Sequence, residues 1–108
     1  MSNRRGTTRI HNTFPALCRI TQPTFQRASV LDLSEGGARL VLRDQVEVGA
    51  RLVLNIKLEA QRSISLEVEV VRVQGQEVGV RHIGGSLMDL RFLSAWVHRQ
   101  SMILSVAA

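Results

Sequence analysis

An apolar residue at every second position in two stretches is the feature that most limits how this chain can fold. The first stretch places an apolar side chain at every second position: Leu52, Leu54, Ile56 and Leu58. The second stretch repeats the pattern at Ile64, Leu66, Val68 and Val70. A period of two puts such side chains on one face of a strand, so both stretches are predicted to be half-buried β-strands. At Val71 the apolar phase slips by one residue, which predicts a β-bulge that bends the second strand.

Shorter candidate strands flank this pair. They span residues 16–20, 28–33 and 38–42, and another begins at Val78. Turn-forming residues separate these segments, and no helical pattern lies between them. Short strands joined in this way predict an antiparallel sheet that is closed or nearly closed into a small barrel, with a two-sheet sandwich as the alternative.

The last quarter of the chain changes to helical spacing. Ser86 and Asp89 form a capping box, with Asp in place of the usual Glu. Four apolar residues follow at helical spacing: Leu90, Leu93, Trp96 and Val97. They predict a helix from about residue 86 to about residue 99 whose apolar stripe covers a mouth or open side of the barrel. The uncharged residues 101–108 would extend this helix or pack on a partner.

The excess positive charge lies at the N-terminal end of the chain. Residues 1–31 contain five arginines and no acidic residue, whereas residues 32–108 contain nine basic and nine acidic residues. A general preference for arginine over lysine would not remove every acid from one segment. The basic end therefore predicts an anionic partner, such as a nucleotide, a nucleic acid or a membrane surface.

Length and cysteine content indicate the class of protein and its compartment. A chain of 108 residues is long enough for one domain with one core. Its apolar runs are too short to span a membrane, and no apolar segment of a signal peptide follows the first arginines. Cys18 is the only cysteine, so the chain cannot form an internal disulfide. We predict a cytoplasmic protein, or a cytoplasmic domain of a larger one.

Patterns typical of catalysis or metal binding are missing from the sequence. The three histidines, His11, His82 and His98, are not spaced as metal ligands with one another or with Cys18. The acidic residues alternate outward on predicted strands or lie in turns, without a pair suited to acid–base chemistry. We therefore expect neither an enzyme nor a bound metal or cofactor.

Two short motifs remain, and each is ambiguous alone. Arg5-Gly-Thr-Thr-Arg9 has the pattern R-x-x-x-R, which a chain rich in arginine repeats by chance at Arg39 and Arg43. The segment from Asp32 to Gly37 has the pattern D-x-S-x-x-G, whose residue types also serve an ordinary hairpin turn. The pair is more specific, because the arginines precede the first predicted strand and the second motif lies where the next two strands meet.

At these residues the chain resembles the PilZ domain, the bacterial receptor module for cyclic di-GMP. Both signature motifs are intact and in the family's order, with 22 residues between them. The resemblance covers nearly the whole chain and implies an all-β fold with a C-terminal helix, namely a six-stranded antiparallel β-barrel. It divides one domain, residues 1–108, into a flexible arm that clasps the ligand (1–13), the barrel (14–84) and the helix with its tail (85–108).

The resemblance also implies a cyclic di-GMP site. Its expected residues are Arg4, Arg5, Arg9, Asp32, Ser34, Gly37, Arg39 and Gly79. The arm arginines would contact phosphate and guanine, because a guanidinium pairs bidentately with phosphate, matches guanine O6 and N7, and stacks on a purine. Asp32 would accept hydrogen bonds from guanine N1–H and the 2-amino group, and Ser34 would bond phosphate or the guanine edge.

The other positions of this site carry weaker expectations. Gly37 would allow a positive φ or leave room for the ligand, and Gly79 would relieve crowding or mark a bulge. Arg39 would support the site or face solvent. In this family, an arginine directly before the R-x-x-x-R motif accompanies binding of a stacked ligand dimer, and Arg4 has that position here. Five further arginines are interpreted as solvent-facing: Arg19, Arg27, Arg51, Arg62 and Arg72.

The leading hypothesis is a receptor in which the arginine arm folds over the nucleotide and signals to an effector protein, or to a linked synthase or motility domain. One alternative is a PilZ-like interaction adaptor that does not bind nucleotide. A less favoured alternative is a small basic barrel for single-stranded nucleic acid, since such surfaces usually need exposed aromatic platforms. The chain has only three phenylalanines and one tryptophan.

Overall fold

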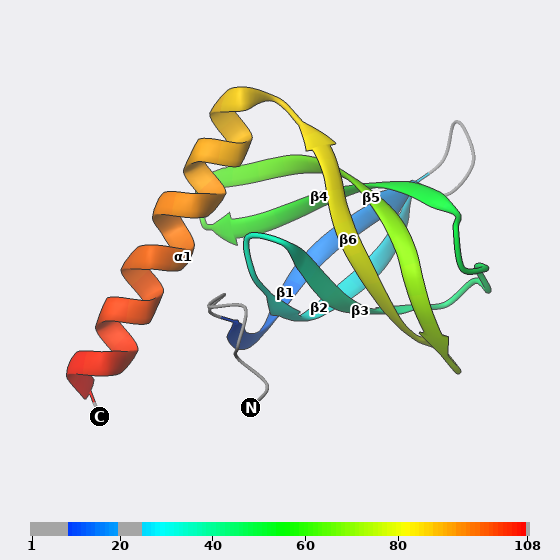
Figure 1. Cartoon of the computed structure of the whole chain (residues 1–108), viewed down its shortest axis with the longest axis horizontal. Helices are drawn as coiled ribbons and strands as arrows, with labels where there is room; N and C mark the ends of the chain where they lie inside the picture. The colour runs from blue at the N-terminus through cyan, green and yellow to red at the C-terminus, as the bar shows by residue number, and fades with distance from the viewer. Residues whose placement is uncertain (1–8, 20–24, 108) are drawn as a thin grey trace.

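The computed structural model describes residues 9–19 and 25–107, and within them the chain forms six strands and one helix (Figure 1). The elements are β1 (Ile10–Arg19), β2 (Gln26–Leu33), β3 (Gly37–Leu42), β4 (Arg51–Glu59), β5 (Arg62–Gln74), β6 (Glu77–Gly85) and α1 (Leu87–Ala107). All neighbouring strands are antiparallel, in the order β1-β2-β3-β6-β5-β4, and β4 pairs with β1 to close a barrel. The barrel prediction is confirmed, and the sandwich is wrong.

The apolar positions of the alternating stretches fill the barrel interior. On β4, Leu52, Leu54 and Ile56 are fully buried, as are Ile64 and Leu66 on β5. The polar residues between them face outward, as a period of two requires. One continuous core therefore runs through the barrel, and the functional side chains lie on its outer surface.

Two β-bulges change which residues reach that surface. The predicted bulge at Val71 is confirmed, because Val70 pairs with Val80 whereas Arg72 pairs with Gly79. A second bulge, which was not predicted from the sequence, lies at Leu31 between Val30 and Asp32. These extra residues reverse the alternation beyond them. As a result, Leu33 enters the core and Asp32 stays on the outer side, beside Arg39.

The first strand begins earlier than the sequence suggests. Residues 10–13 were expected in the flexible arm, but β1 starts at Ile10, which pairs with Leu33 of β2 and is buried. Ile10 and Phe14 are four residues apart, so alternation along the strand places both in the core. Burial of these two side chains anchors the start of the strand.

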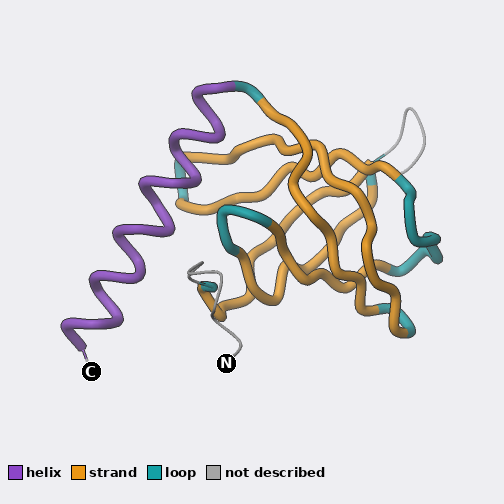
Figure 2. Tube along the Cα trace, in the orientation of Figure 1, coloured by secondary structure: helices purple, strands orange, loops and turns teal. Residues whose placement is uncertain are grey.

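Helix α1 lies across one end of the barrel, and the loops at the other end lie on the opposite side of the molecule (Figure 2). Leu93, Trp96 and Val97 are buried there, and the rings of Trp96 and Phe14 form a T-shaped pair with 5.3 Å between ring centroids. The Ser86 hydroxyl accepts the Asp89 N–H at 3.0 Å, which gives one half of the predicted capping box. The Asp89 carboxylate instead accepts the N–H of Ser65 at 3.0 Å and so ties the helix to β5.

The helix continues to Ala107, eight residues beyond its predicted end near 99. The sequence leaves residues 101–108 open between helix and partner contact, and the structure makes 101–107 helical. With neither glycine nor proline in that segment, nothing in it stops the helix. Among the described residues, no helix is long and apolar enough to cross a membrane.

Candidate functional site

Four neighbouring strands place one row of residues side by side on the outer surface of the barrel. Strand pairing sets Asp32 of β2 opposite Arg39 of β3, Arg39 opposite Gly79 of β6, and Gly79 opposite Arg72 of β5. The two bulges create this row, because one lies directly before Asp32 and the other directly before Arg72. Residues that are far apart in sequence thus form one surface site, which we call the cross-strand row.

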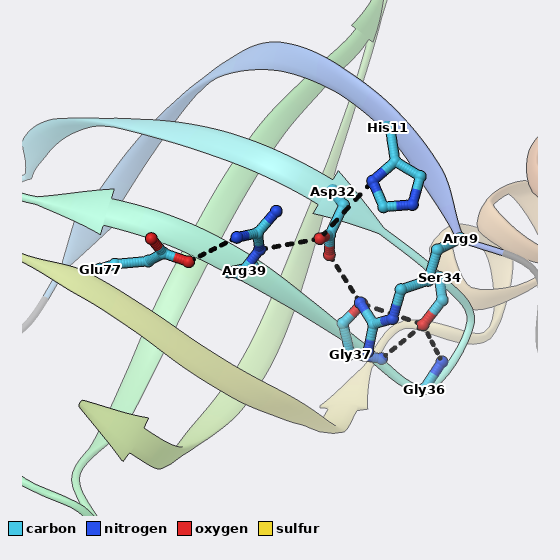
Figure 3. A network of polar contacts seen from close by, with 8 residues as sticks. All are labelled: Arg9, His11, Asp32, Ser34, Gly36, Gly37, Arg39 and Glu77. Atoms are coloured by element: carbon cyan, nitrogen blue, oxygen red, sulfur yellow. Dashed lines mark hydrogen bonds and ion pairs between the residues drawn. The ribbon is translucent and has the colours of Figure 1, made fainter. Parts of the chain in front are cut away.

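Asp32 is the centre of this site. Its side chain is only 5% exposed, and Arg9 Nη1 donates to its Oδ1 at 2.6 Å. Arg39 Nε donates to the other oxygen, Oδ2, at 2.9 Å, and His11 Nδ1 lies 3.9 Å from the same oxygen (Figure 3). A buried carboxylate needs such partners, because burial without them would penalise its charge. Asp32 therefore holds two guanidinium groups at the mouth of the site.

Arg39 connects Asp32 to a second carboxylate. Its Nη1 donates to Glu77 Oε2 at 2.6 Å, so one guanidinium joins carboxylates from β2 and β6 (Figure 3). Its hydrogen bonds to Glu77 and Asp32 raise the pKa of Arg39 above its ordinary value. Arg39 thus joins two carboxylates beside the pocket and does not only face solvent.

A pocket of about 350 Å³ opens along the row. Arg9, Asp32, Arg39, Arg72 and Gly79 all line it. A Cβ on Gly79 would lie 3.5 Å from the Arg72 guanidinium, so the missing side chain leaves space that Arg72 partly covers. Arg72 is exposed, as its interpretation as solvent-facing predicts, but that interpretation did not include its place on the pocket wall. The phase slip at Val71 is the signal that could have identified Arg72, since a bulge changes the face of the residue after it.

The turn after β2 uses the D-x-S-x-x-G motif for its own geometry. The Ser34 hydroxyl accepts the N–H of Gly36 at 3.3 Å and of Gly37 at 3.2 Å, and it donates to the Gly37 carbonyl at 3.2 Å. Ser34 is almost fully buried, so a direct contact with a ligand would require this turn to open. In this structure the Ser34 hydroxyl therefore stabilises the turn through hydrogen bonds, as a serine does in an ordinary hairpin.

Gly37 has a structural role that the sequence did not indicate. Its φ is not positive, so the turn does not depend on a left-handed glycine here. A Cβ at Gly37 would lie 2.4 Å from the Val80 carbonyl oxygen on β6, a contact that backbone atoms could relieve only by moving. Gly37 thus lets β3 approach β6 closely where the row is built.

The same turn contacts both β6 and the helix. Ser94 of α1 donates its hydroxyl proton to Glu35 Oε2 at 3.1 Å. His82 Nδ1 lies 3.0 Å from the Glu35 carbonyl oxygen, and burial lowers the pKa of His82.

The described residues contain no cluster of three or more histidine, cysteine or acidic side chains that could hold a metal ion. Cys18 is buried, which raises the pKa of its thiol to about 11 and makes it a poor nucleophile.

The structure gathers most of the residues expected at the site. Arg9, Asp32, Arg39 and Gly79 meet in the pocket. Ser34 and Gly37 lie in the adjoining turn. Arg4 and Arg5 lie outside the described residues. The fold and site together define a small β-barrel with a cationic surface pocket built around one buried carboxylate.

Comparison with known proteins identifies the family. The family model of the PilZ domain matches residues 3–99, so the chain belongs to the PilZ family. No curated protein sequence matches the chain.

Solved structures show the same fold at low sequence identity. The Bacillus subtilis inhibitor of motility MotI/DgrA superposes with a TM-score of 0.78 and 21% identity, over 92% of this chain and 52% of that one. This chain thus spans about half the length of MotI/DgrA. The PilZ domain of YcgR from Escherichia coli, solved with c-di-GMP, superposes with a TM-score of 0.69 and 15% identity, over 97% of this chain and 99% of that one. The PilZ domain of CeSA from a cellulose-synthesizing bacterium superposes with a TM-score of 0.65 and 17% identity, over 91% of this chain and 98% of that one.

Proposed function

We propose that this chain is a receptor for cyclic di-GMP and that the cross-strand row is its binding surface. The observation that carries the proposal is the buried Asp32 carboxylate, held between the guanidinium groups of Arg9 and Arg39 in the pocket. The family match and the YcgR domain solved with c-di-GMP support the choice of ligand.

The charges of the row suit a dinucleotide with two phosphates. Three arginines, Arg9, Arg39 and Arg72, line the pocket, while the carboxylates of Asp32 and Glu77 offset only part of their charge. The sequence adds two more arginines at positions 4 and 5. Each phosphate carries one negative charge, and guanidinium forks bind phosphate through paired hydrogen bonds. The surplus of cations therefore favours a dianion.

Guanine recognition requires an acceptor among these donors, and Asp32 is the one placed for it. A carboxylate accepts hydrogen bonds from both N1–H and the 2-amino group, which arginine cannot do. In the free protein, Arg9 and Arg39 occupy the two oxygens of Asp32. We propose that the ligand displaces Arg9 from Asp32, after which the arm arginines, including Arg4 and Arg5, turn to phosphate and guanine. The ordering cost of the arm is offset by charge-assisted bonds and stacking.

The proposed role is signalling in the cytoplasm, without catalysis. Movement of the arm would be the output, read by an effector protein or by a linked synthase or motility domain. The contact between Glu35 and Ser94 supports a second route, because it links the turn after Asp32 to α1. Relatives named for motility inhibition and for cellulose synthesis suggest motility or exopolysaccharide control as the process.

Titration calorimetry tests the receptor proposal. We expect saturable binding of cyclic di-GMP to the parent chain, no binding of GTP, and loss of binding in the double variant Arg5→Ala/Arg9→Ala. Removing two charge-assisted hydrogen-bond donors together should weaken binding by about 100-fold or more. A folded parent chain that gives neither heat nor a thermal shift with cyclic di-GMP would contradict the proposal and favour the interaction adaptor.

Arg72→Ala tests the residue that the sequence pattern places in solvent. Removing a guanidinium from the pocket wall should weaken cyclic di-GMP binding by about tenfold, the cost of roughly one charge-assisted hydrogen bond. Stability should barely change, because Arg72 is exposed. Arg91→Ala, on the exposed side of α1, is the matched control and should bind like the parent. Equal affinity of the two variants would remove Arg72 from the site.

A further inference from the structure

A second and larger concave surface lies on a different part of the barrel. Its volume is about 740 Å³, and it is lined by residues of β1 to β4, by Ser63 of β5 and by residues that follow β3 and β5. We call it the basic groove. It shares β2, β3 and β5 with the cross-strand row, but Arg27 of the groove and Asp32 of the row lie toward opposite ends of β2, roughly 16 Å apart along the strand. None of the described residues that line the row's pocket also lines the groove.

The charge of the basic groove has one sign. Arg27, Arg43 and Lys57 line it, and no acidic residue is among the described residues that do so. Ala28 pairs with Leu42 at the end of β3, so the next residues, Arg27 and Arg43, flank the end of this strand pair. Like charges in that position repel each other. Asp44 relieves this in part, since its Oδ1 lies 3.8 Å from Arg43 Nε, but Arg27 and Lys57 have no ion pair within the described part of the chain.

The groove is also lined by aliphatic side chains. Pro15 and Leu17 are exposed on β1, and Val41 is half-buried on β3, on the other side of β2. Leu17 points away from the core and has 43% of its surface exposed. A surface that combines exposed aliphatic side chains with cations matches a partner that carries apolar and acidic groups together.

The shape and composition of the groove select among anionic partners. A bilayer surface is broad and would touch the rim of a concave groove before its interior. Single-stranded nucleic acid usually stacks its bases on aromatic side chains, and none is among the described residues that line the groove. An extended polypeptide can enter such a groove and place its aliphatic side chains against those of the groove while its carboxylates meet the cations.

We propose that the basic groove is a docking site for an acidic segment of a partner protein, with aliphatic side chains interspersed among its Asp and Glu residues. Arg27, Arg43 and Lys57 bind its carboxylates, and Pro15, Leu17 and Val41 bind its apolar groups. This site does not depend on nucleotide binding at the cross-strand row. It gives the domain a surface through which it holds its effector while the row remains free for a ligand.

Selection from a display library of random dodecapeptides on the whole chain tests this site. We expect the enriched peptides to be acidic and to contain Leu, Ile or Val. Binding of a labelled enriched peptide, followed by fluorescence anisotropy, should weaken by about tenfold or more in Arg27→Glu/Lys57→Glu and should decrease as salt is raised. The control Arg51→Glu/Arg91→Glu makes the same change in net charge at exposed positions outside the groove and should bind like the parent.

Three further measurements make the result decisive. Asp32→Ala should retain peptide binding, so that failure of the receptor proposal and failure of this one are distinguishable. Thermal melts should show that every variant is folded. Oligo(dT) and vesicles containing phosphatidylglycerol are titrated in parallel. The proposal is overturned if no peptide is enriched, if the enriched peptides bind the groove variant as well as the parent, or if only oligo(dT) or vesicles bind through Arg27 and Lys57.

Discussion

Replacing Asp32 with alanine is expected to weaken cyclic di-GMP binding by about 10- to 100-fold, the range for removal of one bidentate contact to a base edge. The carboxylate is the acceptor available to guanine at the centre of the row, and its neighbours Arg9 and Arg39 are both donors. The fold should survive, because Arg39 keeps its contact with Glu77. Calorimetry gives the affinity, and a thermal melt shows that the variant is folded.

Two control variants sharpen this prediction. Asp32→Asn keeps the shape but can accept only through one atom, so it should bind nearly as weakly as Asp32→Ala. Glu47→Ala removes an exposed carboxylate from the connection between β3 and β4 and should bind like the parent. If Asp32→Ala keeps the parent affinity, Asp32 does not read guanine and its role is limited to holding Arg9 and Arg39.

Trp96→Ala is expected to cause the largest loss of stability, about 3–5 kcal/mol. Trp96 is 3% exposed, joins α1 to the barrel and packs against Phe14 of β1. Such a loss is a large part of the roughly 5–15 kcal/mol that stabilises a typical domain. The free energy of unfolding, measured with urea, checks this value.

A milder variant and a control on the same helix keep the test interpretable if Trp96→Ala does not fold. Trp96→Phe retains an aromatic ring against Phe14 and should lose only part of the stability. Met102→Ala truncates a side chain that is 55% exposed, so it should change the free energy of unfolding by about 0.5 kcal/mol or less. Comparable losses at Trp96 and Met102 would show that α1 does not depend on its packed face.

The architecture could be predicted from sequence because it depends on periodic patterns. Alternation in the two longest apolar stretches identified their buried faces, and a phase slip identified the bulge at Val71. The bulge at Leu31 has the same signal, because Val30 is followed by the apolar residues Leu31 and Leu33 on the opposite parity. It was missed because the short segment was taken for simple alternation that ended at Leu33.

The site was predicted only in part because it depends on strand register. Arg9 and Asp32 are 23 residues apart, and Arg39 and Glu77 are 38 apart, so neither ion pair follows from spacing along the chain. Arg72 reaches the pocket only because β5 shifts its register against β6. The motifs supplied the central residues, whereas pairing across the barrel decided which other arginine lies beside them.

A map of backbone amide chemical shifts on titration with cyclic di-GMP tests the assignment of the nucleotide site to the cross-strand row. We expect the largest changes at amides near Asp32, Arg39, Gly79 and Arg72, on four neighbouring strands, and small changes in the basic groove. Shifts centred on Arg27 and Lys57, or an unchanged spectrum at saturating ligand, would contradict the assignment of the nucleotide site to the cross-strand row.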